Sequence, residues 1–391
     1  MLEKRYLTNY ILKDLTKKMV FVGGPRQVGK TTISRELIGS LFKNPLYLNW
    51  DNRHDRKRIM TGNWHRENDL LILDEVHKYS KWKSLIKGYY DVEKEQHDFL
   101  ITGSARLNIY RKGNDSLQGR YHYYRCHPFT IAEINDFHSL CQPFSNLLES
   151  GQETKAQGLS DLLAFGGFPE PFLAQEHQVL RRWHNEKIER LFREDINEVE
   201  NIRDLQSMKL LSDIIPDKIG SLLSINNISN DLQKSYTAIA SWIEILDLYY
   251  YHFRVYPYQG KNIRSLKKEP KIYLWDWSEV DNDSARFENL IAAHLLKFVH
   301  LLYDYEGYKS TLYFIRDRDQ REIDFLVTIG DKPWFAVEVK LHDTSLSKNI
   351  KYFQERLNIP FVYQVVKNSN INIPHKNAFV ISADDFLKCL V

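Results

Sequence analysis

The stretch "GGPRQVGKTT" at residues 23–32 decides the fold of the N-terminal part of the chain. It follows the apolar run "MVFV", which has the length of a buried parallel strand. Gly24, Gly29, Lys30 and Thr31 fit the phosphate-loop pattern G-x-x-x-x-G-K-[ST] without deviation. We therefore expect a strand, a phosphate-binding loop and then a helix over "TTISRELIGSLF".

The residue types in this loop match the chemistry of a nucleoside triphosphate. Glycines let backbone amides curl around a phosphate, and the N-terminal end of the next helix attracts negative charge. Lys30 would reach the β- and γ-phosphates, and the Thr31 hydroxyl would hold Mg²⁺. The cofactors expected are ATP and Mg²⁺, and the predicted nucleotide-binding residues are Gly24, Pro25, Arg26, Gln27, Val28, Gly29, Lys30, Thr31 and Thr32.

An acidic pair follows the next buried strand. In "LLILDEVHKY", four apolar residues end in Asp74 and Glu75. Asp74 can bind Mg²⁺ through water, and Glu75 can polarise the attacking water. Such a pair is also a common helix cap, but its place after a phosphate loop favours the metal site.

A third strand and an arginine complete the predicted site. "HDFLITGSARL" ends in Thr102 and Ser104, and a polar side chain there can lie beside the γ-phosphate. A turn around Gly103 is the alternative. Arg120 follows a glycine and precedes an aromatic strand, where it could reach the γ-phosphate of a neighbouring subunit or lie plainly on the surface.

Several motifs together resemble a group of prokaryotic AAA ATPases that carry a C-terminal domain of unknown function, number 4143. The motifs are "RYL", "GPRQVGKTT", "LDEVHKYSKWKSLIKGYYD", "ITGSA", "LQGRYHYYRCHPFTIAE" and "GGFPEP". The resemblance implies an AAA-type core of parallel strands with helices on both faces, followed by a helical region. It assigns the nucleotide and metal roles to Lys30, Thr31, Asp74 and Glu75, and a sensor role to Ser104. Arg120 falls where the family has a Gly-Arg pair.

Composition is that of an ordinary globular protein. A chain of 391 residues is too long for one core, and its net charge of +3 does not by itself indicate nucleic acid. Three scattered cysteines predict reduced thiols in the cytoplasm. We expect no membrane association, because no apolar run approaches the roughly 18 residues that span a bilayer.

The middle of the chain predicts helices and then a module like a winged helix. Apolar residues recur at helical spacing from 158 to about 215, which indicates a helical lid. Residues 215–258 then predict the helices "PDKIGSLLS", "ISNDLQ" and "YTAIASWIEILDLYY" and an extended segment. The last helix has no Lys or Arg and carries Glu244 and Asp247, so a packing module is favoured over a reader of DNA.

The loop after this module is basic. It could follow a phosphate backbone or simply be solvated, and its cations are Lys261, Arg264, Lys267, Lys268 and Lys271.

Charged residues interrupt two apolar strands in "REIDFLVTIGDKPWFAVEVKL", residues 321–341. Strand parity puts Glu338 and Lys340 on one face, and Asp324 on the neighbouring strand can join them. The predicted order of helix, antiparallel strands, helix and strand resembles the PD-(D/E)XK nuclease core, and Asp324 before a Glu-x-Lys fits its signature.

By that resemblance, Asp324 and Glu338 would bind Mg²⁺ and Lys340 would assist catalysis. Glu288 on the preceding helix matches the extra acidic residue, and Gln354 is a weaker candidate. Ile323 stands where the proline of the motif would be. The alternative is a nuclease-like fold whose acids form ordinary ion pairs.

The sequence therefore predicts an α/β protein: an AAA-type P-loop parallel sheet with a helical lid, a winged-helix-like module and a PD-(D/E)XK nuclease-like domain. The predicted boundaries are 1–150, 151–205, 206–260 and 261–391. The predicted function is Mg²⁺-dependent ATP hydrolysis coupled to action on branched or damaged DNA, and homo-oligomerisation is expected. The alternative is a nucleotide-dependent switch that binds a protein partner through an inert nuclease-like domain.

Overall fold

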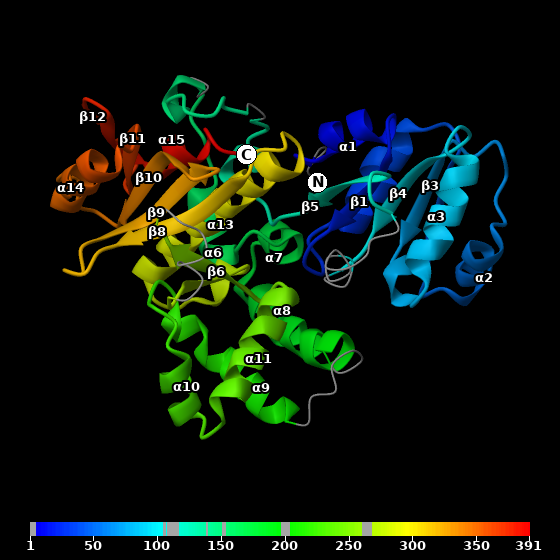
Figure 1. Ribbon diagram of the computed structural model, residues 1–391, viewed down its shortest axis with the longest axis horizontal. Helices are drawn as coiled ribbons and strands as arrows, with labels where there is room; N and C mark the ends of the chain where they lie inside the picture. The colour runs from blue at the N-terminus through cyan, green and yellow to red at the C-terminus, as the bar shows by residue number, and fades with distance from the viewer. Residues whose placement is uncertain are drawn as a thin grey trace. The chain divides into compact units, whose positions relative to one another are not determined.

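The computed structural model describes residues 5–104, 107, 117–137, 140–150, 154–196, 204–259 and 268–391. These residues divide into two compact units, Met1–Pro128 and Phe129–Val391 (Figure 1). The first unit ends earlier than the predicted limit of 150, because residues after Pro128 pack on the second unit. For example, Trp334 Nε1 donates to the Ser145 carbonyl at 2.9 Å. The four-part division stays a prediction.

The first unit is built on a five-stranded parallel sheet in the order β2-β3-β4-β1-β5. This confirms the α/β class and the parallel sheet. Its elements are α1 (Thr8–Leu15), β1 (Met19–Gly23), π-helix η1 (Thr32–Ile38), η2 (Gly39–Leu41), β2 (Pro45–Asn49), α2 (Arg53–Thr61), β3 (Leu70–Asp74), η3 (Val76–Lys78), α3 (Trp82–Glu93), β4 (Asp98–Thr102) and β5 (Tyr121–Arg125).

Both faces of this sheet are covered, which explains its continuous apolar strands. Every residue of β1 and β3 is buried. Alternate side chains such as Phe21 and Leu71 pack with Trp82 and Ile86 of α3. The α1 helix contacts β1, β4 and η1. Because both faces lie in core, the strands are fixed in register, and their polar ends meet at one edge.

The second unit begins with helices and continues into the segment predicted as a winged helix. Its first elements are α5 (Ile131–Ile134), η4 (Leu147–Ser150), α6 (Leu159–Phe165), α7 (Pro169–Ala174), α8 (His177–Arg190), π-helix η5 (Leu191–Ile196), α9 (Leu205–Ile214), η6 (Pro216–Lys218), α10 (Ile225–Asp231), α11 (Tyr236–Leu248), β6 (His252–Pro257) and β7 (Lys271–Leu274).

The remaining elements include the other strands of an eight-stranded mixed sheet, and helices that pack on it. The order of its strands is β12-β13-β11-β10-β9-β8-β6-β7. These remaining elements are η7 (Trp277–Glu279), α13 (Asp283–Asp304), β8 (Ser310–Arg316), β9 (Glu322–Ile329), β10 (Lys332–Lys340), α14 (Lys348–Leu357), β11 (Phe361–Val366), β12 (Asn372–His375), β13 (Ala378–Ser382) and α15 (Ala383–Leu387). Within the described ranges no helix is long and apolar enough to cross a membrane.

The predicted helix over "PDKIGSLLS" is wrong beyond its first turn. The helix ends at Lys218, and Gly220 adopts a φ of 75°, in the left-handed region that favours glycine. The chain then pairs with β7, through the Gly220 N–H to the Ile272 carbonyl at 3.4 Å and a bridge from Leu222 to Lys271. Tertiary pairing has therefore overridden helix propensity here.

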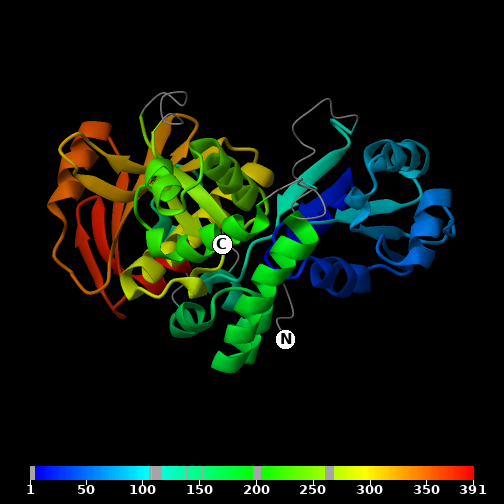
Figure 2. The same ribbon diagram turned by 90° about the horizontal axis from the view of Figure 1, so that it is seen from below.

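Helices α13 and α14 cover opposite faces of the large sheet (Figure 2). Ile350 and Phe353 of α14 pack with Ala336 of β10. The preceding residue of the strand, Phe335, faces the other way and contacts Phe298 of α13, with ring centroids 6.2 Å apart. The predicted order of helix, antiparallel strands, helix and strand is present as α13, then β8, β9 and β10, then α14 and β11. The last strand, β11, pairs in parallel with β10.

A buried ion pair joins the first helix of the second unit to α13. Lys297 Nζ donates to Glu133 Oε2 at 2.6 Å and to Thr130 Oγ1 at 2.8 Å, and the lysine and glutamate side chains are both fully buried. Thr130 Oγ1 in turn donates to the Val391 carbonyl at 2.7 Å. The pair thus ties the start, middle and end of this unit together.

Breaking this pair should destabilise the second unit. Lys297→Met leaves the Glu133 carboxylate buried without its cation, which should cost about 3–5 kcal/mol of unfolding free energy. Urea unfolding followed by tryptophan fluorescence would measure it. Arg193→Met, which removes an exposed pair with Glu189 at 3.0 Å, is the control and should cost less than about 1 kcal/mol. Equal effects of the two changes would contradict the assignment.

Candidate functional site

The polar ends of four parallel strands meet at one edge of the first sheet. The register aligns Asn49 with Asp74, Asp74 with Thr102, and Thr102 with Val22. The loop that begins at Gly24 leaves β1 at the same edge. The carboxyl ends of parallel strands are the usual ligand-binding edge of an open α/β sheet. The fold therefore brings the predicted loop and the predicted acids together.

Lys30 is anchored on its own loop. Its Nζ donates to the Pro25 carbonyl at 2.6 Å and to the Gly24 carbonyl at 3.1 Å. The side chain is buried, and burial lowers the pKa of Lys30 while the nearby Glu75 carboxylate opposes that change. Within the loop, Gln27 has a φ of 57°, which is typical of backbone that turns its amides inward to bind an anion.

Three hydroxyl groups hold the Asp74 carboxylate. Thr31 Oγ1 donates to Oδ2 at 3.1 Å, Tyr47 OH donates to the same oxygen at 2.7 Å, and Thr102 Oγ1 donates to Oδ1 at 2.5 Å. The contact with Thr31 joins the two residues that the sequence predicted as Mg²⁺ ligands. Sequence reasoning missed Tyr47, because only the pairing of β2 with β3 brings it to Asp74.

Glu75 stands in a strained backbone conformation. Its φ is 57°, which is uncommon for a residue other than glycine, and its N–H donates to the Thr102 carbonyl at 3.0 Å. Such outliers gather at functional sites. Burial raises the pKa of Glu75, and Lys30 opposes the rise.

His77 connects Glu75 to the predicted sensor. Its Nε2 lies 3.5 Å from Glu75 Oε2 and 3.4 Å from Ser104 Oγ. Gly103 makes this possible, because a Cβ added there would lie 2.4 Å from His77 Nδ1. His77 was not among the predicted site residues, although "DEVH" and "TGS" follow strands that end at the same edge of the sheet.

Arg120 lies at the opposite edge of the sheet. Tyr121, the next residue, pairs with Met19 at the beginning of β1, whereas the phosphate loop follows the end of that strand. Arg120 Nε donates to Asp91 Oδ1 at 2.6 Å, and a terminal nitrogen donates to Asp91 Oδ2 at 3.2 Å. The structure therefore separates Arg120 from the loop of its own subunit, and a role toward a neighbouring subunit stays a prediction.

The second unit brings its predicted acids into one neighbourhood. Lys340 Nζ lies 2.8 Å from Glu338 Oε1, as their shared face of β10 requires. Asp324 Oδ2 accepts the Val339 N–H at 2.8 Å. Burial, the larger cause, and repulsion from the Asp324 carboxylate, the smaller one, raise the pKa of Glu338 to about 7. The same two causes raise the pKa of Glu288 to about 7.

Lys271 enters the same group from β7. Its Nζ lies 2.5 Å from Glu322 Oε1, 3.4 Å from Glu288 Oε1 and 3.6 Å from Asp324 Oδ1. Burial alone would lower the pKa of Lys271, but the three carboxylates outweigh it and the pKa is raised. The expectation that Lys271 belongs to a solvated or phosphate-binding loop is therefore wrong, because the residue is a buried member of an edge strand.

Among the other cations of the basic loop, the structure describes Lys268 alone. Lys268 is exposed, and Lys261, Arg264 and Lys267 lie outside the described residues. On α14, the Gln354 side chain donates to the Asn377 carbonyl at 3.2 Å, so the structure pairs it with backbone.

Three family models match this chain. Residues 16–135 match a model described as an AAA domain, residues 156–278 match a domain of unknown function (DUF8612), and residues 284–386 match a domain of unknown function (DUF4143). The chain carries an AAA domain and a DUF4143 domain. This confirms the resemblance at that level, and the AAA match supports a P-loop nucleotide-binding ATPase.

The relatives that match most of this chain are described only as uncharacterized proteins, so their names give no activity to compare. An uncharacterized protein of Methanocaldococcus jannaschii is 23% identical over 387 residues, which cover 93% of this chain and 82% of the relative. An uncharacterized protein of Mycobacterium tuberculosis is 20% identical over 350 residues, covering 85% and 73%. The RuvB Holliday junction branch migration motor of Thermotoga maritima aligns with 64% of this chain and 87% of its own, at 15% identity and a TM-score of 0.30. At that score RuvB does not bear on the function.

The AAA domain fits a magnesium nucleotide. Thr31 and Asp74 provide hard oxygen ligands at contact distance, and the partners of Asp74 are neutral hydroxyls that leave its charge in place. Lys30 and the loop amides supply the positive groups for phosphate.

The acids near the DUF4143 strands do not fit a divalent ion as they are arranged. Lys271 already lies among Glu288, Glu322 and Asp324. In the ranges that the structure describes, no three His, Cys, Asp or Glu side chains come together as metal ligands. The metal roles of Glu288, Asp324 and Glu338 stay predictions.

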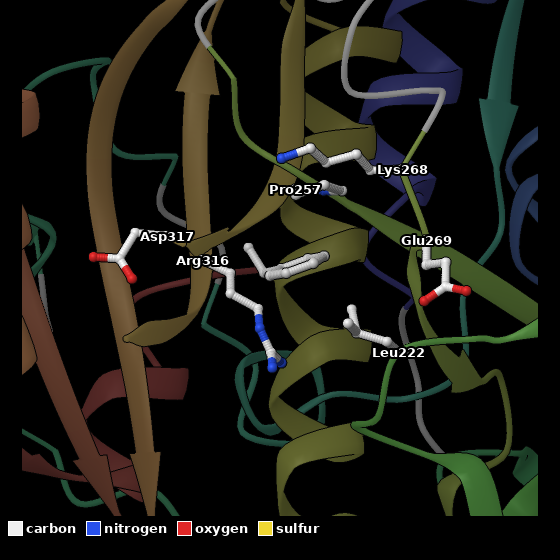
Figure 3. Close-up of a pocket in the computed structure, with 7 residues that line it drawn as sticks. Leu222, Pro257, Lys268, Glu269, Arg316 and Asp317 are labelled. Atoms are coloured by element: carbon white, nitrogen blue, oxygen red, sulfur yellow. The ribbon is translucent and has the colours of Figure 1, made fainter. Parts of the chain in front are cut away.

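A cavity of about 290 Å³ lies beside these acids. Phe314 lines it, and Lys271 Nζ lies 5.7 Å from the centroid of that ring. Arg316 also lines it (Figure 3). The Arg316 guanidinium contacts Glu322 Oε2 at 3.0 Å. The other lining residues are Leu222, Pro257, Lys268, Glu269 and Asp317.

The acids of α11, the helix for which the sequence favours packing over DNA reading, form ion pairs with a neighbouring strand. Arg254 of β6 contacts Glu244 of α11 at 2.6 Å and Asp247 at 2.7 Å. The acidic face of α11 is therefore partly neutralised by the adjacent strand. The helices α10 and α11 and the strand β6 follow the predicted second helix, third helix and extended segment, but the winged-helix identity stays a prediction.

His77 should position Glu75 for hydrolysis. His77→Phe keeps a ring against Gly103 but removes the nitrogen near Glu75 and Ser104, so we expect the kcat of ATP hydrolysis to fall about tenfold with little change in KM. Steady-state rates would measure both constants. His97→Phe changes another buried histidine, which bonds to the Asn68 carbonyl, and should leave kcat unchanged. A similar fall in both variants would remove the positioning role.

Proposed function

We propose that the first unit is a Mg²⁺-dependent ATPase whose site consists of the phosphate loop, Asp74 and Glu75. The observation that supports this most directly is the 3.1 Å contact between Thr31 Oγ1 and Asp74 Oδ2. It joins the hydroxyl of the loop to the carboxylate of a distant strand, and these are the two oxygen ligands that such a site needs.

Each residue of the site has a separate role in ATP hydrolysis. Lys30 and the loop amides bind the phosphates, and Thr31 and Asp74 hold Mg²⁺, which supplies charge neutralisation when bound. Glu75 orients the attacking water and accepts a proton on its carboxylate. Its raised pKa suits a base better than that of an ordinary exposed glutamate. His77 holds Glu75 near Ser104, so a side chain that senses the γ-phosphate acts on the base.

Arg120 requires a second copy of the chain to take part. Its position at the opposite edge of the sheet favours a role toward the nucleotide of a neighbouring subunit in a homo-oligomer. The bidentate contact with Asp91 would have to open for that role.

Two substitutions separate binding from hydrolysis. Lys30→Ala removes the cation that reaches the phosphates and should abolish measurable binding of a fluorescent ATP analogue. Glu75→Gln keeps the shape of the site but not the base, so ATP should still bind while turnover falls by about 100-fold or more.

Glu95→Gln is the control for the charge change, since that side chain is 86% exposed, and it should behave as wild type. Unimpaired turnover in Glu75→Gln would overturn its assignment.

For the second unit we propose the switch with an inert nuclease-like domain over cleavage of branched or damaged DNA. The two functions differ in whether Asp324 and Glu338 hold a metal ion. The observation that favours the switch is the Lys271 ammonium among the acids. The ATP cycle would then control binding of a protein partner, not strand cleavage.

A cleavage assay tests this choice. Wild-type protein, Mg²⁺ and branched or linear DNA, with and without ATP, should give no product, and Asp324→Ala should behave the same. Asp331→Ala removes an exposed acid on the turn after β9 and is the control. Cleavage by wild type and Asp331→Ala that is lost in Asp324→Ala would establish the nuclease instead.

A further inference from the structure

The Lys271 ammonium has three carboxylate neighbours and almost no contact with solvent. Its side chain is 3% exposed, and Glu288, Glu322 and Asp324 surround it from α13 and β9. Lysine is rarely buried to this extent unless it is paired. The lysine lies outside the matched DUF4143 segment and the three acids lie inside it, so the group is assembled across two parts of the chain.

The strand that carries Lys271 is fixed. Lys271 pairs with Val255 across the sheet and forms a bridge with Leu222 on its other side. The preceding Pro270 carbonyl accepts the Leu223 N–H at 2.8 Å. Because the backbone is held on both sides, the ammonium is a permanent part of this group and not the end of a swinging loop.

Other charges in the group are also matched. Lys340 contacts Glu338 Oε1, and Arg316 contacts Glu322 Oε2. Three cations thus stand against the four carboxylates of Glu288, Glu322, Asp324 and Glu338, which leaves one carboxylate charge unmatched. The fixed ammonium therefore already supplies part of the positive charge that a divalent ion would otherwise bring.

Most of the oxygens that could bind a metal are already bonded. Glu288 Oε1 accepts the Tyr273 hydroxyl at 2.7 Å, Asp324 Oδ2 accepts the Val339 N–H, and Asp324 Oδ1 faces Lys271. Glu338 Oε2 is buried and has no hydrogen-bond partner within the described part of the chain. Mg²⁺ and Ca²⁺ take six or more oxygen ligands, and most of the oxygens that face one another here already have a hydrogen-bond donor or an ammonium beside them.

We propose that Lys271 is a built-in cation, standing where a metal-dependent nuclease would hold its divalent ion and keeping these acids from binding one. The inference rests on the proposal that the nuclease-like domain is inert, and it gives that inertness a single cause. Removing the ammonium should leave a cluster of carboxylates that attracts a divalent ion.

The test compares Mn²⁺ binding by nucleotide-free wild type and Lys271→Met, using electron paramagnetic resonance and thermal unfolding. Asp74→Asn in both proteins removes any contribution from the AAA domain. Wild type should show no Mn²⁺ binding that is lost when Asp324 is changed to Asn. Lys271→Met should melt at a lower temperature without metal, and it should bind Mn²⁺ at least about tenfold more tightly than wild type. Adding Asp324→Asn to Lys271→Met should abolish that gain.

Two further variants serve as controls. Lys271→Arg keeps the positive charge, and Lys332→Met removes an exposed lysine that is not part of the group, so neither should gain Mn²⁺ binding. If Lys271→Met does not fold, Asp324-dependent Mn²⁺ binding by wild type still decides the matter, because its presence overturns the proposal and its absence supports it.

The outcomes separate this inference from the proposed function. DNA cleavage by wild type would overturn both. A folded Lys271→Met that gains no Mn²⁺ binding, in a protein that cleaves no DNA, would overturn only the role of Lys271.

Discussion

A carboxylate that is buried at the end of a strand must be given partners, and this constraint organises both functional regions of the protein. In the first unit it explains why β2, β3 and β4 end level with one another, since Tyr47, Asp74 and Thr102 can meet only in that register. In the second unit it explains why an edge strand, β7, carries a lysine whose side chain lies in the core. The geometry of each region follows from how its acids are satisfied.

The sequence was most informative where function depends on a continuous segment. The loop from Gly24 to Thr31 is read directly from local spacing, and its strand and the Asp74–Glu75 pair follow from short apolar runs. What it could not supply were partners brought in by strand pairing. Tyr47 and Lys271 acquire their roles from residues far along the chain, and no local pattern marks them. His77 follows the acidic pair directly, but its contact with Ser104 depends on the pairing of β3 with β4.

Two errors show which physical terms a local reading omits. Lys271 ends a run of basic residues, so its charge indicated a solvated loop, but pairing with Val255 and Leu222 draws its backbone into the sheet. "PDKIGSLLS" has apolar residues spaced as on one face of a helix, yet Gly220 in the left-handed region and its bond to Ile272 follow the end of the helix. In both cases the hydrogen bonds of β7 outweighed the preference of the local sequence.

The kind of partner decides what a buried carboxylate can still do. Asp74 is held by three hydroxyls, which orient it without neutralising it, so its negative charge remains available to a cation beside the phosphate loop. Asp324 and Glu288 face an ammonium, which orients and neutralises at once. Hydroxyl partners therefore leave the first site dependent on an external metal for charge balance, whereas the cations of the second group supply most of its charge balance from the chain itself. On this account, two acidic regions of one chain differ in chemistry because one was given neutral donors and the other a charged one.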